Sequence, residues 1–214
     1  MRSVDFKQHW EDAYRQKPEE MVSWFQLRPA ISLALLHAAG IRKDDAIIDV
    51  GGGASRLVDY LLAEGFTDIS VLDIAESALK QAQKRLGTAA DKVHWIAADV
   101  TQWRPQRKYG LWHDRAVFHF LTDPAARVAY RRNLQTALAA GGIAIIASFA
   151  PDGPERCSGL PVQRYSPESL AGELGPKFRL KDHRSEDHQT PAGKLQHFQY
   201  SVLEHRHLSR ASAD

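Results

Sequence analysis

The stretch from Ile47 to Leu61, IIDVGGGASRLVDYL, constrains the fold of the chain more than any other part of the sequence. A short apolar run leads directly into three consecutive glycines, and an amphipathic helical pattern follows them. Glycines gather in such a turn where the backbone passes so close to another group that a side chain would collide with it. The stretch therefore predicts a buried strand, a tight turn and a helix, which is the repeating unit of α/β folds.

Apolar runs and helical patterns continue to alternate along the chain after this unit. The strands predicted from the apolar runs are residues 46–50, 69–73, 93–99, 109–114 and 143–149. The helices predicted between them are residues 56–64, 76–86 and 122–142. In the last of these helices Asp123 suits the N-cap, Pro124 suits the first helical position and Gly141 follows the end. This order of elements predicts a parallel sheet whose strands are joined by crossover helices.

Two segments lie outside this alternation. The first is an aromatic N-terminal segment followed by a helical pattern at residues 31–39, so residues 1–40 are expected to cap a core formed by residues 41–150. The second is the proline-rich segment 151–167, which lacks the pattern of a helix or strand and at this length favours a lid over a site.

The chain returns to regular structure after this segment. Residues 168–214 predict a helix that starts near Pro167, followed by strands at 178–183 and 195–203. No linker interrupts the pattern, so residues 1–214 are expected to form a single domain.

The composition restricts the possible partners and location. The 28 basic and 26 acidic residues give a net charge of +2, which argues against nucleic acid or a membrane surface as a partner. The single cysteine, Cys157, excludes a disulfide within the chain and favours a cytoplasmic location. Neither a secretory leader nor a membrane-spanning run is evident in the sequence.

The glycine turn does not match the common phosphate-binding motifs. Gly51, Gly53 and Arg56 give the spacing G-x-G-x-x-R, so the third glycine of a dinucleotide-binding turn is missing. The Gly-Lys-Ser/Thr ending of a P-loop is also absent. The turn is therefore expected to hold a group other than a phosphate.

Four acidic residues, each at the end of a predicted strand, point to the nature of this group. They are Asp49, Asp73, Asp99 and Asp114. In an open α/β sheet the carboxyl ends of the strands meet at one crevice, where ligands bind. An acidic crevice favours a cation, or a nucleoside without phosphates whose ribose hydroxyls can donate hydrogen bonds to a carboxylate.

With these spacings the chain resembles the class I S-adenosylmethionine-dependent methyltransferases, from about Ala46 to Phe149. DVGGGAS matches the first motif of that family, with Ser55 in place of its last glycine, while VLDIAESAL and AADVTQW match its second and third acidic motifs. The resemblance implies a Rossmann-like, doubly wound, mostly parallel seven-stranded sheet flanked by helices. It also implies S-adenosyl-L-methionine as cofactor.

The resemblance assigns roles to residues of the crevice. The backbone of Gly51, Gly52 and Gly53 is expected to approach the methionine part of the cofactor, with Asp49 organising the turn. Asp73 is expected to hold the ribose, and Asp99 with Val100 to bracket the adenine. Ile74 and Trp24 complete the predicted cofactor contacts, although the N-terminal aromatics are as well explained by packing of a helix onto the sheet.

The methyl acceptor is less well defined by the sequence. The segment HDRAVFHF is similar to thiopurine-type and other thiol methyltransferases, and also to lysine methyltransferases that act on elongation factors. It carries the predicted catalytic residues Asp114, Arg115 and His119. Arg156, Arg164 and Tyr165 are predicted to bind the substrate from the lid. The three arginines favour a small-molecule acceptor with a thiol or another soft or anionic nucleophile, and a protein lysine is the alternative.

Some observations favour structural roles or other functions. The spacing of His113, His119, His183, His188 and His197 fits no metal-ligand pattern, so no metal is expected. Cys157 follows Arg156, which lowers thiol pKa values when close, but a lone cysteine without a catalytic role is favoured. A nucleotide-dependent oxidoreductase and a non-catalytic cofactor-binding protein remain as alternatives of another class.

Overall fold

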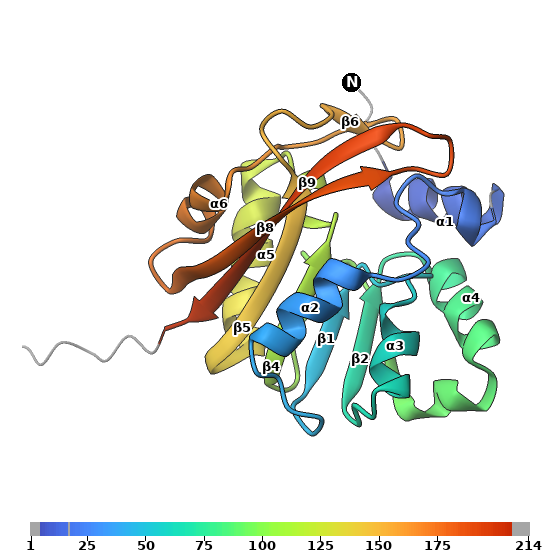
Figure 1. Ribbon diagram of the computed structural model, residues 1–214, viewed down its shortest axis with the longest axis horizontal. Coiled ribbons are helices and arrows are strands. Elements are labelled where there is room, and N and C mark those ends of the chain that lie inside the picture. The colour runs from blue at the N-terminus through green and yellow to red at the C-terminus, as the bar shows by residue number, and fades with distance from the viewer. Residues whose placement is uncertain (1–4, 17, 207–214) are drawn as a thin grey trace, which may run out of the picture.

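A seven-stranded sheet runs through the computed structural model, which describes residues 5–16 and 18–206 (Figure 1). The strand order is β3-β2-β1-β4-β5-β9-β8. The first five strands in this order are parallel to one another, and β9 pairs antiparallel with both β5 and β8. The strand bounds are Ile47–Val50 (β1), Ile69–Asp73 (β2), Val93–Ala97 (β3), Tyr109–Arg115 (β4), Leu138–Phe149 (β5), Phe178–Gln189 (β8) and Leu195–His205 (β9).

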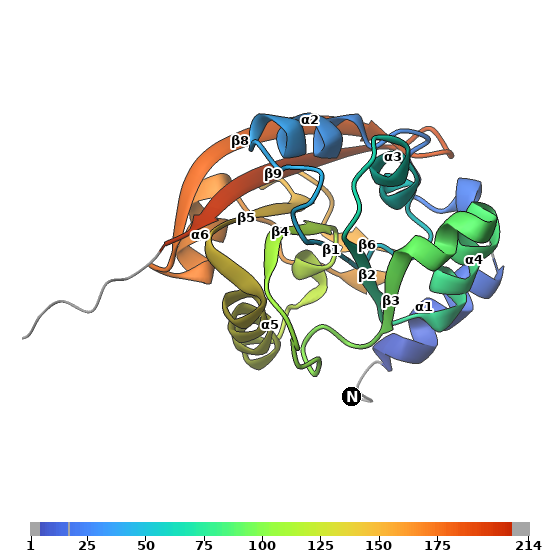
Figure 2. The ribbon, with the colours of Figure 1, turned by 90° about the horizontal axis from the view of Figure 1, so that it is seen from below.

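Helices cover both faces of the sheet (Figure 2). One face packs against α2 (Ala30–Ala38), α3 (Leu57–Ala63) and α4 (Glu76–Leu86), and the other packs against α5 (Pro124–Ala137) and α6 (Pro167–Leu174). At the edge, α1 (Phe6–Gln16) lies beside α4. Short 3-10 helices occur at Glu19–Met21 (η1), Gly87–Lys92 (η2) and Phe118–Phe120 (η3).

The alternation of side chains along the central strands explains this layering. Ile47 of β1 packs on the α2–α3 face, and its neighbour Ile48 packs on the α5 face. Ile145 and Ile146 of β5 divide in the same way, and all four are fully buried. A strand that is apolar on both faces is stable only between two layers of helices. The predicted doubly wound, mostly parallel seven-stranded sheet is therefore confirmed.

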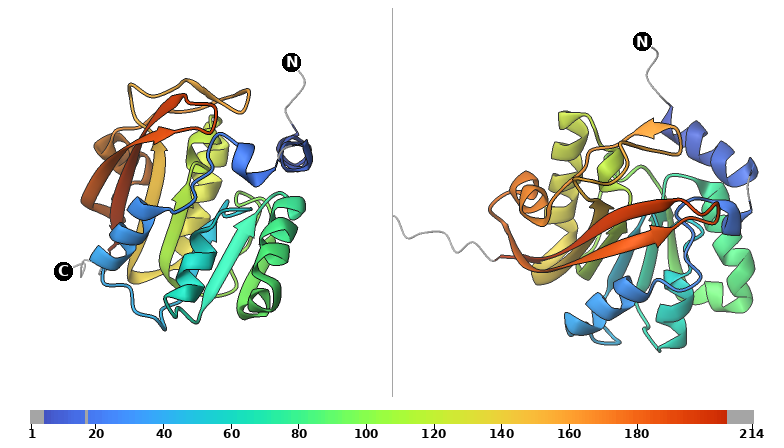
Figure 3. Two further views of the ribbon diagram at one scale, coloured as in Figure 1. Left: turned by 45° about the vertical axis from the view of Figure 1, so that its right-hand side comes forward. Right: turned by 45° about the horizontal axis from the view of Figure 1, so that its top comes forward.

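The strand order places a crevice at one end of the sheet. From β1 the chain moves outward to β2 and β3, then returns to the other side of β1 to form β4. The connections that leave β1 and β4 therefore diverge, and the carboxyl ends of these strands are left uncovered by crossover helices. In Figures 1 and 3, α1, the β6–β7 segment and the loop between β8 and β9 lie at this end.

The predicted helix 122–142 is wrong at its C-terminal end. The helix ends at Ala137, Leu138 has an extended backbone with ψ 134°, and β5 begins there. Leu138 pairs with Tyr109 of β4, and Gly141 has φ +74°, which no helix allows. The alanine-rich sequence favours a helix locally, but pairing with β4 decides its conformation.

Other boundaries also differ from the prediction. The segment 151–167, predicted without regular structure, contains a small antiparallel pair, β6 (Arg156–Cys157) and β7 (Leu160–Pro161). The turn between them uses Ser158 at φ 50° and Gly159 at φ 79°. Strands β8 and β9 are longer than predicted, because charged side chains of β8 are tolerated on a sheet edge.

None of the helices in the described residues has the length and hydropathy that crossing a membrane requires.

The backbone of Gly141 gives a test of the revised boundary. Gly141→Ala should destabilise the protein by about 1–2 kcal/mol, because the left-handed conformation disfavours any residue with a Cβ, although no atom would collide with the new methyl group. Gly172→Ala is the matched control, because this glycine also has open space around it but lies in α6. It should stabilise the protein by about 0.5–1 kcal/mol. Urea denaturation measures both, and equal effects would contradict the boundary.

Candidate active site at the carboxyl ends of the strands

A cavity occupies the crevice at the switch point of the sheet. Its walls are the loops that follow β1, β2, β3 and β4, together with α1 and the segment around Trp24. Cys157 of β6 and Phe198 of β9 close it from the other side. Of the residues predicted to bind the cofactor, six line this cavity: Trp24, Gly51, Asp73, Ile74, Asp99 and Val100.

Asp73 ends β2 with a buried carboxylate. Its Oδ1 accepts a hydrogen bond from the backbone N–H of Ala75 at 2.8 Å, and its Oδ2 has no hydrogen-bond partner among the described residues. Burial is the main reason why the pKa of Asp73 is raised to about 7, and the nearby Asp49 and Glu11 carboxylates add to the shift. A buried acceptor that is only half satisfied is suited to binding a hydroxyl donor of a ligand.

Asp99 repeats this arrangement after β3. Its Oδ1 accepts hydrogen bonds from the backbone N–H and the hydroxyl of Thr101, both at 2.8 Å, and its Oδ2 has no partner among the described residues. From α5, the Asn133 side chain donates to the carbonyl of Val100 at 2.7 Å. These bonds fix the loop and present the buried Val100 side chain to the cavity.

The two carboxylates and their surroundings fit a nucleoside. Each uses one oxygen to hold its own loop and leaves the other for a ligand hydroxyl or amino group. The apolar side chains of Ile74, Val100 and Leu121 line the same cavity and suit a flat base. The donor set thus fits the adenosine of S-adenosylmethionine, and the assignment of Asp73 to the ribose and of Asp99 to the adenine stays a prediction.

The glycine turn is required by the protein itself as well as by any ligand. A Cβ on Gly51 would lie 2.0 Å from a methyl group of Val117, and one on Gly52 would lie 2.6 Å from Asp49 Oδ2. A Cβ on Gly53 would lie 2.7 Å from Asp73 Oδ2 and 2.8 Å from the Tyr14 hydroxyl. Packing within the protein therefore disfavours a side chain at each of the three positions, independently of any cofactor.

Asp49 and His113 form a buried group behind the turn. His113 contacts Asp49 through Nδ1 at 2.7 Å and the Ser32 hydroxyl through Nε2 at 2.9 Å. All three line a second, adjoining cavity together with Gly51 and Gly52. Asp49 thus lies directly against Gly52 of the turn and does not line the main cavity, and its role in organising the turn stays a prediction.

The N-terminal segment is held over the cavity by polar contacts. The carboxylate of Glu11 accepts hydrogen bonds from the backbone N–H groups of Glu76 and Ser77, at the N-terminus of α4. The aromatic side chains of Trp10, Tyr14 and Trp24 line the cavity, and the Trp10 and Trp24 rings are 5.5 Å apart in an edge-to-face arrangement. The aromatics thus both pack the cap and cover the site.

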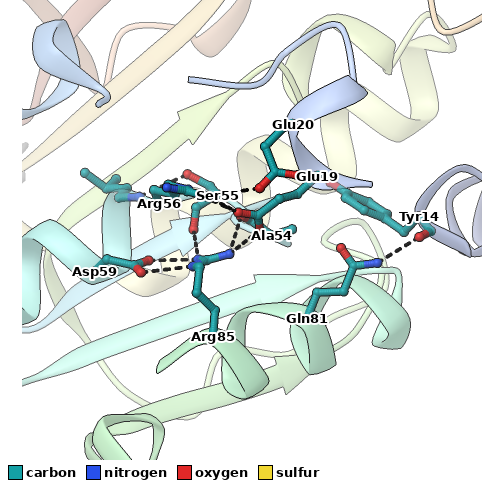
Figure 4. A network of polar contacts seen from close by, with 10 residues as sticks. Tyr14, Glu19, Glu20, Ala54, Ser55, Arg56, Asp59, Gln81 and Arg85 are labelled. Carbon is teal, nitrogen blue, oxygen red and sulfur yellow. Dashed lines mark hydrogen bonds and ion pairs between the residues drawn. The ribbon is translucent and has the colours of Figure 1, made fainter. Parts of the chain in front are cut away.

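Arg85 of α4 connects the cap to the glycine turn (Figure 4). Its guanidinium donates to Glu19 of η1, to both carboxylate oxygens of Asp59, and to the carbonyls of Ala54 and Ser55. Glu19 also accepts two hydrogen bonds from Arg56. These contacts tie Glu19 of the cap to the residues that follow the glycines.

Arg115, at the end of β4, is the only one of the predicted catalytic residues that lines the cavity. Its Nε donates to the Tyr200 hydroxyl at 2.9 Å and its Nη1 donates to the carbonyl of Trp24 at 3.1 Å. Its Nη2 lies 3.4 Å from Glu186, which provides an opposite charge. The aromatic rings of Phe120 and Phe198 lie in the same wall.

Asp114 and His119 are placed differently from the prediction. The Asp114 carboxylate is fully buried, accepts a 2.6 Å hydrogen bond from Tyr130 and caps the backbone N–H groups of Val117 and Phe118. The His119 ring is also fully buried, between Phe120 and Phe149. Burial, followed by the charge of Arg115, lowers the pKa of His119 to about 3. Neither side chain lines the cavity, so the structure gives them packing roles.

The three residues predicted to bind the substrate also lie outside the cavity wall. Arg156 is exposed and donates to the carbonyl of Gly159. Arg164 pairs with Glu155 and donates to Gly153 at the surface. Tyr165 is buried against Phe118 in the core on the α5–α6 side. Cys157 is the residue of this segment that reaches the cavity, which the sequence pattern did not indicate.

A family model described as a methyltransferase domain matches residues 47–142. The chain is 28% identical over 100 residues to the bovine eEF1A lysine and N-terminal methyltransferase, a match that covers 47% of this chain and only 14% of that protein. The N-methyltransferase NodS from Bradyrhizobium japonicum, solved with S-adenosyl-l-homocysteine, is 15% identical and superposes with a TM-score of 0.69, over 92% of this chain and 98% of NodS.

Residues 47–142 are thus similar to a methyltransferase domain, and the chain has the fold of S-adenosylmethionine-dependent methyltransferases.

A further similar structure comes from a study of the conversion of a disulfide bond into a thioacetal group during echinomycin biosynthesis. It is 18% identical to this chain, with a TM-score of 0.75 over 95% of this chain and 94% of the other. At these identities the solved structures support the fold, and they do not identify the methyl acceptor.

Several residues around the candidate site were not evident in the sequence. Glu186, Phe198 and Tyr200 come from the C-terminal hairpin, far along the chain from Arg115, and only the pairing of β9 with β5 brings them to the site. No distinctive sequence motif surrounds Glu186, which lies on the edge strand β8. Within the described residues, three or more His, Cys, Asp or Glu side chains nowhere gather as a metal site requires.

The buried carboxylate of Asp73 predicts how the stability of the protein depends on pH. Since burial raises its pKa from 3.8 to about 7, the folded protein keeps a proton that the unfolded chain releases between these values. The free energy of unfolding should therefore fall as the pH rises from 4 towards 7. Asp73→Asn removes this loss, so at pH 8 the variant should be more stable than wild type, by at most about 4 kcal/mol.

Thermal unfolding at pH 5 and pH 8, without cofactor, measures this effect. Asp91→Asn, a change at an exposed carboxylate, is the control for net charge and should track wild type. If the difference between Asp73→Asn and wild type is the same at both pH values, the carboxylate is not perturbed in the folded protein.

Proposed function

We propose that this methyltransferase binds S-adenosylmethionine in the main cavity and methylates a small molecule through a soft nucleophile, with a thiol as the first choice. The cofactor supplies an electrophilic methyl group on its sulfonium when bound. The proposal rests on the side chains that line the acceptor end of the cavity. Its walls are Trp10, Trp24, Phe120, Phe198 and Cys157, with Arg115 as the charged residue.

This wall favours a small acceptor over a protein lysine. The carboxylates that line the cavity, Asp73 and Asp99, lie at the ends of β2 and β3 on the nucleoside side. An incoming ammonium would therefore meet the like charge of the Arg115 guanidinium before any anionic partner, which disfavours its charged form. Residues of α1, of the loop around Trp24 and of β6 line the cavity, and these segments lie at the carboxyl ends of the strands in Figure 3.

Fewer arginines favour an anionic acceptor in the structure than in the sequence prediction. Arg156 and Arg164 lie away from the cavity, so Arg115 alone remains, and Glu186 balances part of its charge. Methyl transfer from a sulfonium is an in-line displacement, for which alignment and exclusion of water supply much of the rate. A soft nucleophile such as a thiol, of which a few per cent is ionised at neutral pH, needs little further assistance.

The second candidate is a protein lysine methyltransferase, which the bovine eEF1A lysine and N-terminal methyltransferase supports by its similarity to about half of this chain. Incubation of the protein with methyl-labelled S-adenosylmethionine in a metabolite-rich lysate separates the candidates. Label in the small-molecule fraction supports our proposal. Label that appears only in protein would contradict it, and label bound to the enzyme without turnover would indicate a cofactor-binding protein.

Cys157 allows a test of whether the protein supplies a nucleophile of its own. Burial raises the pKa of its thiol, so little thiolate is present at neutral pH. A direct displacement needs no protein nucleophile, and Cys157→Ser is therefore expected to keep kcat within about threefold of wild type. A loss of a hundredfold or more in kcat, with unchanged affinity for S-adenosylhomocysteine, would show that transfer proceeds through Cys157.

A further inference from the structure

The guanidinium of Arg115 is buried without enough acceptors. Its side chain is 10% exposed, and its hydrogen bonds in the described residues go to Tyr200, Trp24 and Glu186. A guanidinium carries five N–H groups. One N–H on each terminal nitrogen is therefore left without a protein acceptor in this part of the chain, at a position where the side chain lines the main cavity.

The orientation of this guanidinium is fixed by its neighbours. Tyr200 accepts from Nε and donates onward to Glu186 at 2.8 Å, and Gln26 donates to the other oxygen of Glu186 at 2.6 Å. The Arg115 Cζ atom lies 4.4 Å from the centre of the Phe198 ring. Such a held guanidinium loses little entropy when it binds a further acceptor, which makes its free donors selective.

Aromatic rings surround the space next to these donors. Trp10 lies 5.0 Å from Phe120 and 5.5 Å from Trp24 between ring centres, with interplanar angles of 71° and 84°. These three rings and Phe198 line the cavity that Arg115 also lines. Aromatic rings that present both edges and faces to a cavity bind another flat ring more favourably than they bind a saturated chain.

We propose that the acceptor is a flat aromatic molecule that carries an oxygen group, and that Arg115 selects it by donating its free N–H groups to that oxygen. A carboxylate, which accepts from both terminal nitrogens, fits best. This inference rests on the proposed small-molecule function and names its substrate class. It makes Arg115 a specificity residue for the acceptor, without a role in proton transfer.

Four simple probes test the inference on the full-length protein saturated with S-adenosylhomocysteine. They are benzoate, benzamide, cyclohexanecarboxylate and benzylamine, and ligand-detected NMR gives their dissociation constants. Benzoate should bind at least about tenfold more tightly than cyclohexanecarboxylate and than benzylamine, with benzamide between. Equal binding of benzoate and cyclohexanecarboxylate would overturn the aromatic part, and equal binding of benzoate and benzylamine would overturn the role of Arg115.

Two variants separate recognition by Arg115 from its contacts within the protein. Arg115→Gln should weaken benzoate at least about tenfold, since the bidentate charged donor is lost. Glu186→Gln leaves the guanidinium in place but removes its counter-charge, so it should strengthen benzoate binding and leave benzamide unchanged. If Glu186→Gln weakens both probes alike, Arg115 only braces the hairpin, and the inference fails.

The order of the measurements distinguishes this failure from failure of the proposed function. Absence of S-adenosylhomocysteine binding to the wild type would contradict the proposed function itself. Binding of S-adenosylhomocysteine without the expected order of the four probes would contradict only the inference about the acceptor.

Discussion

The rest of the site depends on how tightly the turn Gly51–Gly53 packs against its own protein. Three positions in succession have no room for a Cβ, because Val117, Asp49, Asp73 and Tyr14 occupy the space. These neighbours belong to four different parts of the chain: the loop after β4, the end of β1, the end of β2 and α1. The turn is thus the point at which the sheet, the crevice and the N-terminal cap meet, and a side chain there would separate all of them.

Charge is arranged around this turn in two contrasting ways. Beneath and beside it, the charges are satisfied: Asp49 contacts His113, and Arg85 donates to Glu19, Asp59 and two carbonyls of the turn. Facing the cavity, Asp73 and Asp99 each keep one oxygen without a partner in the described residues. The satisfied groups hold the backbone rigid, and the unsatisfied ones are available to a ligand. Burial of such groups lowers the stability of the empty protein in return for affinity.

Local sequence patterns predicted the sheet well, because each central strand is an apolar run between glycines or charged residues. Asp73 and Asp99 could be assigned for the same reason: a residue that ends a parallel strand must reach the crevice. The same rule failed for Asp114, because Tyr130 of α5 and two backbone N–H groups draw its carboxylate into the core. Whether an acid at a strand end faces a ligand depends on partners that lie elsewhere in the sequence.

The remaining errors have the same physical origin. Pairing with β4 converts the alanine-rich residues after Ala137 into a strand, although they favour a helix locally. Arg156 and Arg164 bind carbonyls and a carboxylate of their own loop, while Cys157, which has no charge to suggest a role, reaches the cavity. The arginine that does line the cavity, Arg115, meets Glu186 and Tyr200 only through the C-terminal hairpin.

The structure of the complex with S-adenosylhomocysteine tests the central claim most directly. We expect both ribose hydroxyls within hydrogen-bond distance of the Asp73 carboxylate, the adenine beside Asp99 and Val100, and the sulfur directed towards the aromatic wall that contains Arg115. A cofactor bound elsewhere, or a ribose that makes no contact with Asp73, would contradict the account.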